Sequence, residues 1–414
     1  MSPRIPPATT PDFAAYRGAL SAAGRDTRPA ALLDLDLFHA NATAMAVRSG
    51  GTPIRVASKS LRVRSALQTA LGLPGYSGVL AFTLPEALWL AETGVRDIVV
   101  AYPTADRQAL ATLLRSEARG HVSVMVDSPE HLELLRTVAR TADAPAHAGF
   151  RVCLDIDAAY LPARNRSEAL TQRLKVGPLR SPIAAVEQAT DMVRACEASG
   201  VELVGIMMYE GQVAGIANGA RTPRGVAVRA MQALSTRDLA AWRAEVVAAV
   251  RELVDLQFVN GGGTGSLEST SAEAAVTEVA AGSGFYGPEL FQHYRGFRPA
   301  PALHLLFDVV RRPSRDTVTV LGGGWVASGP AGTDRLPVPV WPEGLRYAPR
   351  EGPGEVQTPL TGQAAAGLQL GDPVFFRHAK AGEPMERLNR VLVYSGGEII
   401  DEWPTYRGEG KAFL

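Results

Sequence analysis

Ile54-Arg55-Val56-Ala57-Ser58-Lys59-Ser60-Leu61 is an apolar run that ends on a single lysine, just before a segment with helical spacing. In a barrel of parallel strands and helices, functional groups lie at the carboxyl ends of the strands. Lys59 therefore takes a position from which a primary amine can bond to an aldehyde. A solvated lysine that merely ends a strand is the alternative, because most lysines are surface charges.

The composition is that of a globular protein with enough apolar material for a large core. The 414 residues are 46% hydrophobic and 20% charged. Lys+Arg and Asp+Glu both number 42, so no net field attracts nucleic acid or an anionic membrane. No apolar run reaches the ~20 residues of a membrane span, and residues 1–7 lack the apolar core of a signal peptide. Cys153 and Cys196 lie in apolar surroundings without CxxC or Cys/His spacing, which fits buried thiols in a reducing compartment, so we expect a cytoplasmic protein. The expected partner is a small-molecule amino acid substrate, and whether the chain forms a homodimer is left open.

From residue 31 onward, short apolar runs alternate with segments of helical period. Eight runs with helices between them predict a closed (β/α)8 barrel of parallel strands, the TIM-type fold. A doubly wound open sheet is the alternative. The eight runs are Ala31–Phe38, Ile54–Lys59, Gly78–Thr83, Asp97–Tyr102, His121–Val126, Phe150–Ile156, Val201–Tyr209 and Leu256–Val259.

The pattern changes near residue 299. Apolar runs such as Ala302–Val310 and Asp372–His378 alternate with Gly/Pro/Asp turns and have no helical spacers, which is typical of an antiparallel β domain. Arg298-Pro299-Ala300-Pro301 has the composition of a domain joint. We therefore predict a barrel domain at 30–299 and a C-terminal β domain at 300–414 that includes the N-terminal arm, 1–29.

Polar residues close most of the predicted barrel strands. Asp127, followed by Ser128-Pro129-Glu130, is expected to cap a helix. The others are candidates for a site, or alternatively begin turns and helices. They are Lys59, Thr83, Tyr102, Asp155, Asp157, Tyr209, Glu210 and Asn260.

Two glycine-rich turns stand near the end of the predicted barrel: Asn260–Ser266, and Gly282–Gly287 after the apolar stretch Val276–Ala281. Glycines allow backbone N–H groups to converge on an anion, and the last loops of such barrels commonly bind phosphate. Two such loops favour a phosphate site over plain turns. A phosphate site combined with a strand-end lysine suits a phosphorylated aldehyde such as pyridoxal 5'-phosphate (PLP).

These residues resemble the fold-type III PLP enzymes, the alanine-racemase-like barrels, and among them the branch of D-threonine aldolase, D-serine dehydratase and amino acid deaminase/aldolase. The resemblance implies that Lys59 forms the internal Schiff base. It also implies that Tyr209 lies close to the cofactor and that Arg164, beyond the sixth strand, contacts it. The implied phosphate cradle consists of Gly262, Gly263, Thr264, Gly282, Ser283 and Tyr286. The matching segments are Ala31–Asp36, Arg55–Ser60, Gly205–Gly211, Val259–Thr264 and Thr277–Ser283.

The C-terminal domain departs from this pattern. Enzymes of this branch hold a divalent metal near PLP with a histidine and, two residues on, an aspartate or cysteine, whereas this chain has His378-Ala379-Lys380. A lysine ammonium has no lone pair to donate, so the sequence argues against a metal held in the family manner. His378 and Lys380 are instead candidate general acids or bases. An ordinary basic β-turn is the alternative.

The sequence therefore predicts a PLP-dependent lyase acting on a D-configured β-hydroxy amino acid. Such an enzyme would split Cα–Cβ in a retro-aldol step, or remove the hydroxyl and then deaminate. A PLP-dependent racemase or epimerase, with Lys59 and a second base on opposite faces, is the first alternative. A non-catalytic PLP-binding protein is the second, although the additional β domain argues against simple carriage.

Overall fold

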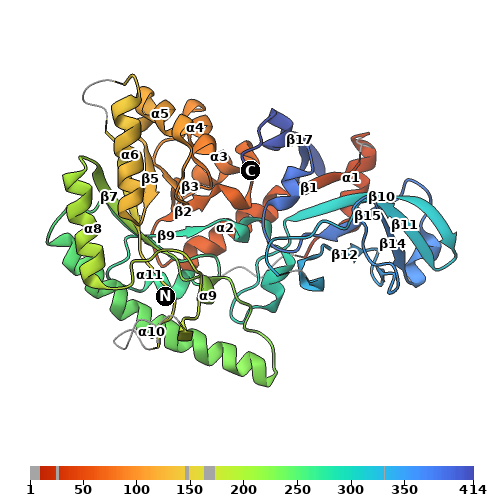
Figure 1. Ribbon diagram of the computed structural model, residues 1–414. Helices are drawn as coiled ribbons and strands as arrows, with labels where there is room; N and C mark the ends of the chain where they lie inside the picture. Colours follow the sequence, from red (N-terminus) through yellow and green to blue (C-terminus); the bar gives the residue numbers. More distant parts are fainter. Residues whose placement is uncertain (1–9, 25–27, 145–148, 163–172, 331) are drawn as a thin grey trace. The chain divides into compact units, whose positions relative to one another are not determined.

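The structure, a computed structural model, describes residues 10–24, 28–144, 149–162, 173–330 and 332–414. Eight parallel strands form a closed barrel, in which the last strand pairs with the first through Val279 and Ile54 (Figure 1). The predicted (β/α)8 barrel is thus confirmed. Its strands are β2 (Ile54–Ala57), β3 (Tyr76–Ala81), β4 (Ile98–Val100), β5 (Val122–Val126), β6 (Arg151–Asp155), β7 (Glu202–Met208), β8 (Phe258–Gly261) and β9 (Glu278–Ala281).

Helices alternate with these strands, and local chemistry explains where several of them begin. The side chains of Thr83 and Asp106 accept backbone N–H groups at the starts of α4 and α5. Prolines in the first turns of α4, α6 and α10 suit positions where the N–H has no helical partner. The helices are α3 (Arg64–Leu71), α4 (Leu84–Glu92), α5 (Arg107–Arg115), α6 (Pro129–Thr141), α8 (Val186–Ala198), α9 (Gly211–Ala214), α10 (Pro223–Arg251) and α11 (Leu267–Ser271), with the 3-10 turn η2 (Glu117–Gly120).

The barrel strands bury a core that contains an ion pair. Arg55 on β2 is 2% exposed and donates to both oxygens of Glu278 on β9, at 2.7 and 2.8 Å. Its guanidinium also lies 5.1 Å from the centre of the Phe258 ring. Such a buried charge requires this complete pairing, because desolvation of a lone guanidinium is costly. The apolar residues of this core are Val99, Met125, Cys153, Val204, Met207 and Phe258.

The second sheet has nine strands, most of them antiparallel (Figure 1). β10, β1, β16 and β17 are consecutive neighbours, and β15 pairs with the other edge of β10. The C-terminal β domain is thus confirmed. Its strands are β1 (Ala30–Asp34), β10 (Leu303–Ser314), β11 (Thr317–Leu321), β12 (Val338–Trp341), β13 (Arg346–Tyr347), β14 (Gln357–Thr361), β15 (Pro373–Arg377), β16 (Arg390–Ser395) and β17 (Glu398–Pro404).

Short helical segments complete this part of the chain. α1 packs through Tyr16, Ala19 and Leu20 against buried residues of the sheet, including Leu306 and Phe375. The segments are α1 (Phe13–Ala22), α2 (Leu35–Arg48), η1 (Ser58–Ser60), α12 (Ser283–Tyr286), η3 (Glu289–His293), η4 (Thr333–Arg335), η5 (Gln363–Gly367), η6 (Glu383–Glu386) and η7 (Arg407–Glu409).

One predicted barrel strand was wrong. The run at Ala31–Phe38 is not the first strand of the barrel, because β1 lies in the second sheet, antiparallel to β10 and parallel to β16. The eighth barrel strand is instead β9, from the apolar stretch before the second glycine turn. A short run that is buried on both faces has the same composition in either sheet, so its pattern does not reveal its neighbours.

The chain divides into two compact units. We call Met1–Ala44, Lys59–Thr69 and Ser283–Ala412 the β unit, and Met45–Ser58, Ala70–Gly282 and Phe413–Leu414 the barrel unit. The segment that begins at Lys59 is therefore counted with the β unit although it directly follows β2. Across the described ranges, none of the helices combines the length and apolarity that a membrane span requires.

Candidate active site

Lys59 lies where the sequence places it, at the carboxyl end of a barrel strand. β2 ends at Ala57, and the chain continues directly into the 3-10 turn Ser58–Ser60. The hydroxyl of Ser58 is fully buried and donates to the carbonyl of Leu80 on β3 at 3.2 Å. This bond fixes the backbone on which the half-buried lysine stands.

Within the β unit, several groups hold the backbone that follows Lys59. Arg62 donates to the carbonyl of Lys59 at 3.1 Å and pairs with Glu386 at 2.8 Å. The buried Tyr286 hydroxyl donates to the carbonyl of Leu61 at 3.1 Å. A Cβ on Gly382 would lie 2.7 Å from the carbonyl oxygen of Lys59, so only glycine permits this close approach. The turn after β15 therefore packs directly against the backbone of the predicted catalytic lysine.

His378, at the start of that turn, is completely buried, and no side chain of the described residues forms a hydrogen bond with its ring nitrogens. Its ring lies edge-on to the ring of Tyr286, with 6.2 Å between centroids. Burial, and then the neighbouring Arg377, lower the pKa of His378 to about 3. The imidazole is therefore neutral at neutral pH. It can accept a hydrogen bond, but it cannot serve as a charged acid.

Lys380, two residues later, contacts a different part of the β unit. Its ammonium group donates to the carbonyl of Ser328 at 3.4 Å, and the side chain lines a small cavity beside Trp325, Glu383 and Arg387. Across the parts of the chain that the structure describes, no three His, Cys, Asp or Glu side chains are grouped to hold a metal ion. With a lysine two residues after His378, the donor set of this turn does not fit a divalent metal.

At the carboxyl ends of other barrel strands, two tyrosines share one arginine. The guanidinium of Arg180 lies 4.9 Å from the ring centre of Tyr209, after β7, and 5.6 Å from that of Tyr102, after β4. The Arg180 side chain is exposed, and no carboxylate of the described ranges forms an ion pair with it. A cation held by aromatic rings at the strand ends can bind an anion. Sequence reasoning missed Arg180, because it is not one of the residues that close a barrel strand.

The two acidic residues around the end of β6 differ in their partners. The carboxylate of Asp157 forms an ion pair with Lys175 at 2.6 Å and accepts a hydrogen bond from the N–H of Ala159. Asp157 therefore has a structural role. Asp155 is 6% exposed, and burial raises its pKa to about 7, with Arg180 acting in the opposite direction. Asp155 can therefore exchange a proton near neutral pH.

The expected helix cap at Asp127 was wrong by one residue. Ser128 occupies the N-cap position of α6, while the carboxylate of Asp127 lies 3.0 Å from the ring nitrogen Nδ1 of His131. Thr83 and Asn260, two other strand-end residues, also have structural partners. Thr83 caps α4, and the amide of Asn260 donates to Glu278 at 2.8 Å.

The backbone amides of the first glycine turn form hydrogen bonds that the sequence does not predict. The N–H of Gly262 donates to Glu210 at 3.2 Å, and the N–H of Gly263 donates to the hydroxyl of Ser266 at 3.1 Å. The sequence predicts that these amides converge on a phosphate, whereas in the structure both donate within the protein, because the buried Glu210 carboxylate lies beside the turn. The carbonyl of Thr264, which is buried in the turn, accepts a hydrogen bond from Arg48 at 2.7 Å.

The second glycine turn follows β9. Gly282 is the last residue of a barrel-unit segment, and Ser283 to Tyr286 form the short helix α12 of the β unit. The fully buried Tyr286 hydroxyl, with a pKa raised by burial, donates to Leu61 as described above. Arg164, the remaining expected cofactor contact, lies outside the described residues.

Comparison with known proteins identifies relatives of this arrangement. The sequence profile described as "Alanine racemase, N-terminal domain" matches residues 33–289. A D-threonine aldolase from Arthrobacter sp. is 25% identical over 305 residues, which cover 71% of each chain. The solved structure of D-threonine aldolase from Filomicrobium marinum superposes with a TM-score of 0.71 at 22% identity, covering 92% of this chain and 96% of the other. D-threo-3-hydroxyaspartate dehydratase from Delftia sp. HT23 gives a TM-score of 0.69 at 22% identity, covering 92% and 97%. The structural likenesses establish the fold.

Proposed function

Because the chain belongs to the alanine racemase N-terminal domain family, we propose that it is a PLP-dependent lyase acting on a D-configured β-hydroxy amino acid. The observation that carries the proposal is the half-buried lysine at the carboxyl end of β2, held on a rigid backbone. The reaction class is supported by the relatives, which are named for aldol cleavage of D-threonine and for dehydration of D-threo-3-hydroxyaspartate.

The residues present fit PLP. Lys59 supplies the primary amine, and the glycine turns after β8 and β9 supply the hydroxyl residues Thr264 and Ser283 for a phosphate. Gly263 leaves no room for a Cβ, which would lie 2.9 Å from Ala214 and 3.2 Å from the ring of Tyr209. We assign to the cofactor Lys59, Tyr209, Thr264, Gly282, Ser283 and Tyr286, together with Arg164 from outside the described ranges. Gly262 and Gly263, whose amides donate within the protein, would shape the loop that carries Thr264. When bound, PLP would supply an electron sink for the amino acid bond that is broken.

The remaining groups would orient the substrate. Arg180, with its guanidinium over two tyrosine rings, would bind the carboxylate that every amino acid substrate carries. The neutral imidazole of His378, in the same unit as Lys59, would accept a hydrogen bond from the β-hydroxyl. Lys380 would contribute positive charge near that turn rather than a metal ligand.

Product analysis tests this proposal. The purified protein is incubated with D-threonine and D-serine, with the L-enantiomers as controls. Glycine plus an aldehyde indicates aldol cleavage, ammonia plus a keto acid indicates dehydration and deamination, and the opposite enantiomer alone indicates a racemase. Lys59→Ala should abolish turnover and the borohydride-stable PLP adduct. Enantiomer exchange as the sole activity would replace the lyase with the racemase.

The same assay tests whether turnover requires a divalent metal. We expect turnover to survive extensive chelation, because an ammonium group stands where the second metal ligand of the branch would be. Turnover that is lost on chelation and restored by manganese or zinc would show that a metal site forms despite Lys380.

A further inference from the structure

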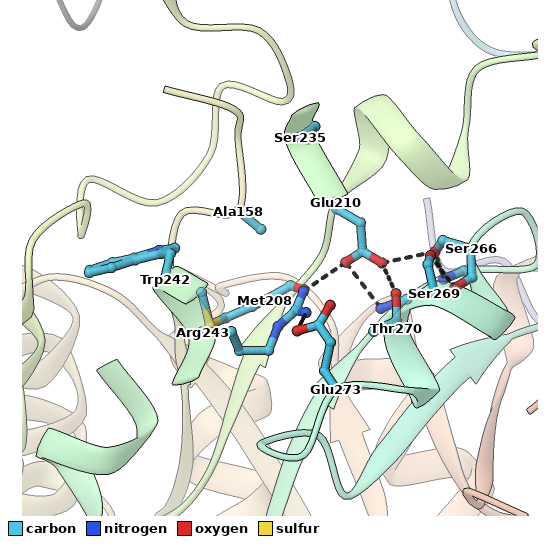
Figure 2. Close-up of polar contacts among 12 residues, drawn as sticks. Ala158, Met208, Glu210, Ser235, Trp242, Arg243, Ser266, Ser269, Thr270 and Glu273 are labelled. Atoms are coloured by element: carbon cyan, nitrogen blue, oxygen red, sulfur yellow. Dashed lines mark hydrogen bonds and ion pairs between the residues drawn. The ribbon is translucent and has the colours of Figure 1, made fainter. Parts of the chain in front are cut away.

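Glu210, the second residue after β7, collects hydrogen bonds from the loop that follows β8. Its carboxylate is 3% exposed. It accepts from the N–H of Gly262 at 3.2 Å, from the hydroxyl of Ser266 at 2.8 Å, and from the hydroxyl of Thr270. Figure 2 shows the side chains of Ser266 and Thr270 converging on Glu210. All of them lie in the barrel unit.

A buried arginine balances the charge of this carboxylate. Arg243 on α10 is 0% exposed, and its guanidinium pairs with Glu210 at 3.1 Å and with Glu273 (Figure 2). It also donates to the carbonyl of Met208 at 3.1 Å, which joins α10 to the end of β7. Removing one member of such a buried ionic group is costly, because the others stay desolvated and unpaired. Arg243 therefore holds the Glu210 side chain in place.

The conformation of the loop depends on this carboxylate. Gly262 has φ +77°, in the left-handed region that favours glycine, and in this conformation its N–H points to Glu210. The N–H of Gly263 reaches the same carboxylate through the hydroxyl of Ser266. On the other side of the turn, Arg48 binds the carbonyl of Thr264 and the carboxylate of Glu268. The two glycine amides are thus committed to Glu210, directly or through one hydroxyl.

We infer that Glu210 is a positioning residue that sets the Gly262–Ser266 loop for the phosphate group of PLP. The inference rests on the proposed function. Three of the four groups that Glu210 binds belong to the segment of that loop and the helix after it, whereas a residue that only stabilised the barrel would need no such concentration of partners. A carboxylate with several donors can hold a loop whose glycines would otherwise sample many conformations.

The test compares PLP with pyridoxal, which carries the same aldehyde but no phosphate. Binding of each to the 414-residue protein, dialysed free of cofactor, is titrated by absorbance for the wild type and for Glu210→Gln. We expect Glu210→Gln to lower the affinity for PLP by about tenfold or more and to leave the affinity for pyridoxal nearly unchanged. A purely structural role would weaken both ligands equally.

Glu86→Gln is the matched control, because Glu86 is a carboxylate with 0% exposure that accepts a backbone N–H, that of Phe82, after another barrel strand. It should leave the preference for PLP over pyridoxal at the wild-type value. Ser266→Ala keeps the pair of Glu210 with Arg243 and breaks only the link to Gly263, so it supports the test if Glu210→Gln does not fold. It should show a smaller, equally phosphate-specific loss.

A wild-type preference for PLP that persists in both Glu210→Gln and Ser266→Ala would overturn the inference while leaving the cofactor assignment standing. Equal affinities of the wild-type protein for PLP and pyridoxal would overturn the proposed phosphate site, and the inference with it.

Discussion

Asp155 ends β6 with a carboxyl group that is almost completely buried, and burial raises its pKa to about 7, well above the ordinary value of 3.8. Asp127 and Asp157 act in the same direction, while Arg180 opposes them. The folded protein thus binds this proton more tightly than the unfolded chain does. The contribution of Asp155 to folding stability is therefore greatest below about pH 4 and is lost as the pH rises through about 7.

We predict that Asp155→Asn removes this pH dependence. In the cofactor-free wild type, the free energy of unfolding should fall between about pH 4 and about pH 7 by up to about 4 kcal/mol on account of this group. The variant should show a correspondingly smaller fall. Urea unfolding of both proteins across that range provides the measurement, and parallel curves for the two would contradict the raised pKa.

Arg180 is the residue to which we assign the substrate carboxylate. Replacing it with methionine keeps an apolar stem between the two tyrosines and removes the charge. We predict that Arg180→Met raises KM for the amino acid about tenfold to a hundredfold, because that factor corresponds to the free energy of a hydrogen bond to a charged group. The absorbance of bound PLP should stay as in the wild type. Arg180→Lys should recover part of the loss. An unchanged KM would remove Arg180 from the substrate site.

At the scale of elements, the glycine turn after β8 shows that a local sequence motif predicts a turn but not the hydrogen-bond partners of its amides. The sequence Gly261-Gly262-Gly263 predicts a tight turn at a strand end, and that turn is present. The partners of its amides are Glu210 and Ser266, and Glu210 comes from a distant part of the chain. A carboxylate about fifty residues earlier leaves no local signal in the turn itself.

We predict that Gly262→Val weakens PLP binding about tenfold or more, because a β-branched residue is strained at φ +77° and would turn the amide away from Glu210. Space alone does not forbid the side chain, since a Cβ would meet its nearest neighbour, Thr270, at 3.4 Å. Gly94→Val is the control, as Gly94 has φ +94° in open space. Both variants should lose about 1–2 kcal/mol of stability. Equal PLP affinities in the two would contradict a role for the turn in binding.

At the scale of the whole molecule, β1, near residue 30, pairs with strands that lie beyond residue 300. Residues 31–33 are 0% exposed, and the strand pairs with β10 on one edge and with β16 on the other. Both partners lie beyond residue 299, the predicted end of the barrel domain. A chain cut there would leave both edges of an apolar strand without partners, a condition that promotes aggregation.

We therefore predict that the fragment 1–299 is mostly insoluble on expression, whereas the chain 1–414 is soluble. Soluble yield and size-exclusion chromatography of the two proteins test this. The fragment 45–299 omits β1 and should be more soluble than 1–299. A monodisperse, folded 1–299 would contradict the dependence of β1 on the C-terminal strands.

The sequence by itself determined the features that depend on neighbours along the chain. Alternating apolar runs and helical segments predicted the barrel, turn-rich runs without helices predicted the β domain, and the end of one run placed Lys59 at the end of β2. Prolines and polar caps marked helix starts for the same reason, although the cap at Asp127 was displaced by one residue.

Only the tertiary structure decided which distant groups meet. The partners of β1, the buried Glu210 behind the glycine turn, the low pKa of His378 and the position of Arg180 over two tyrosines all depend on elements far apart in sequence. The physical reason is that an apolar run or a carboxylate has the same local pattern whichever surface buries it. Burial by distant neighbours is what sets its pairing, its charge and its hydrogen bonds.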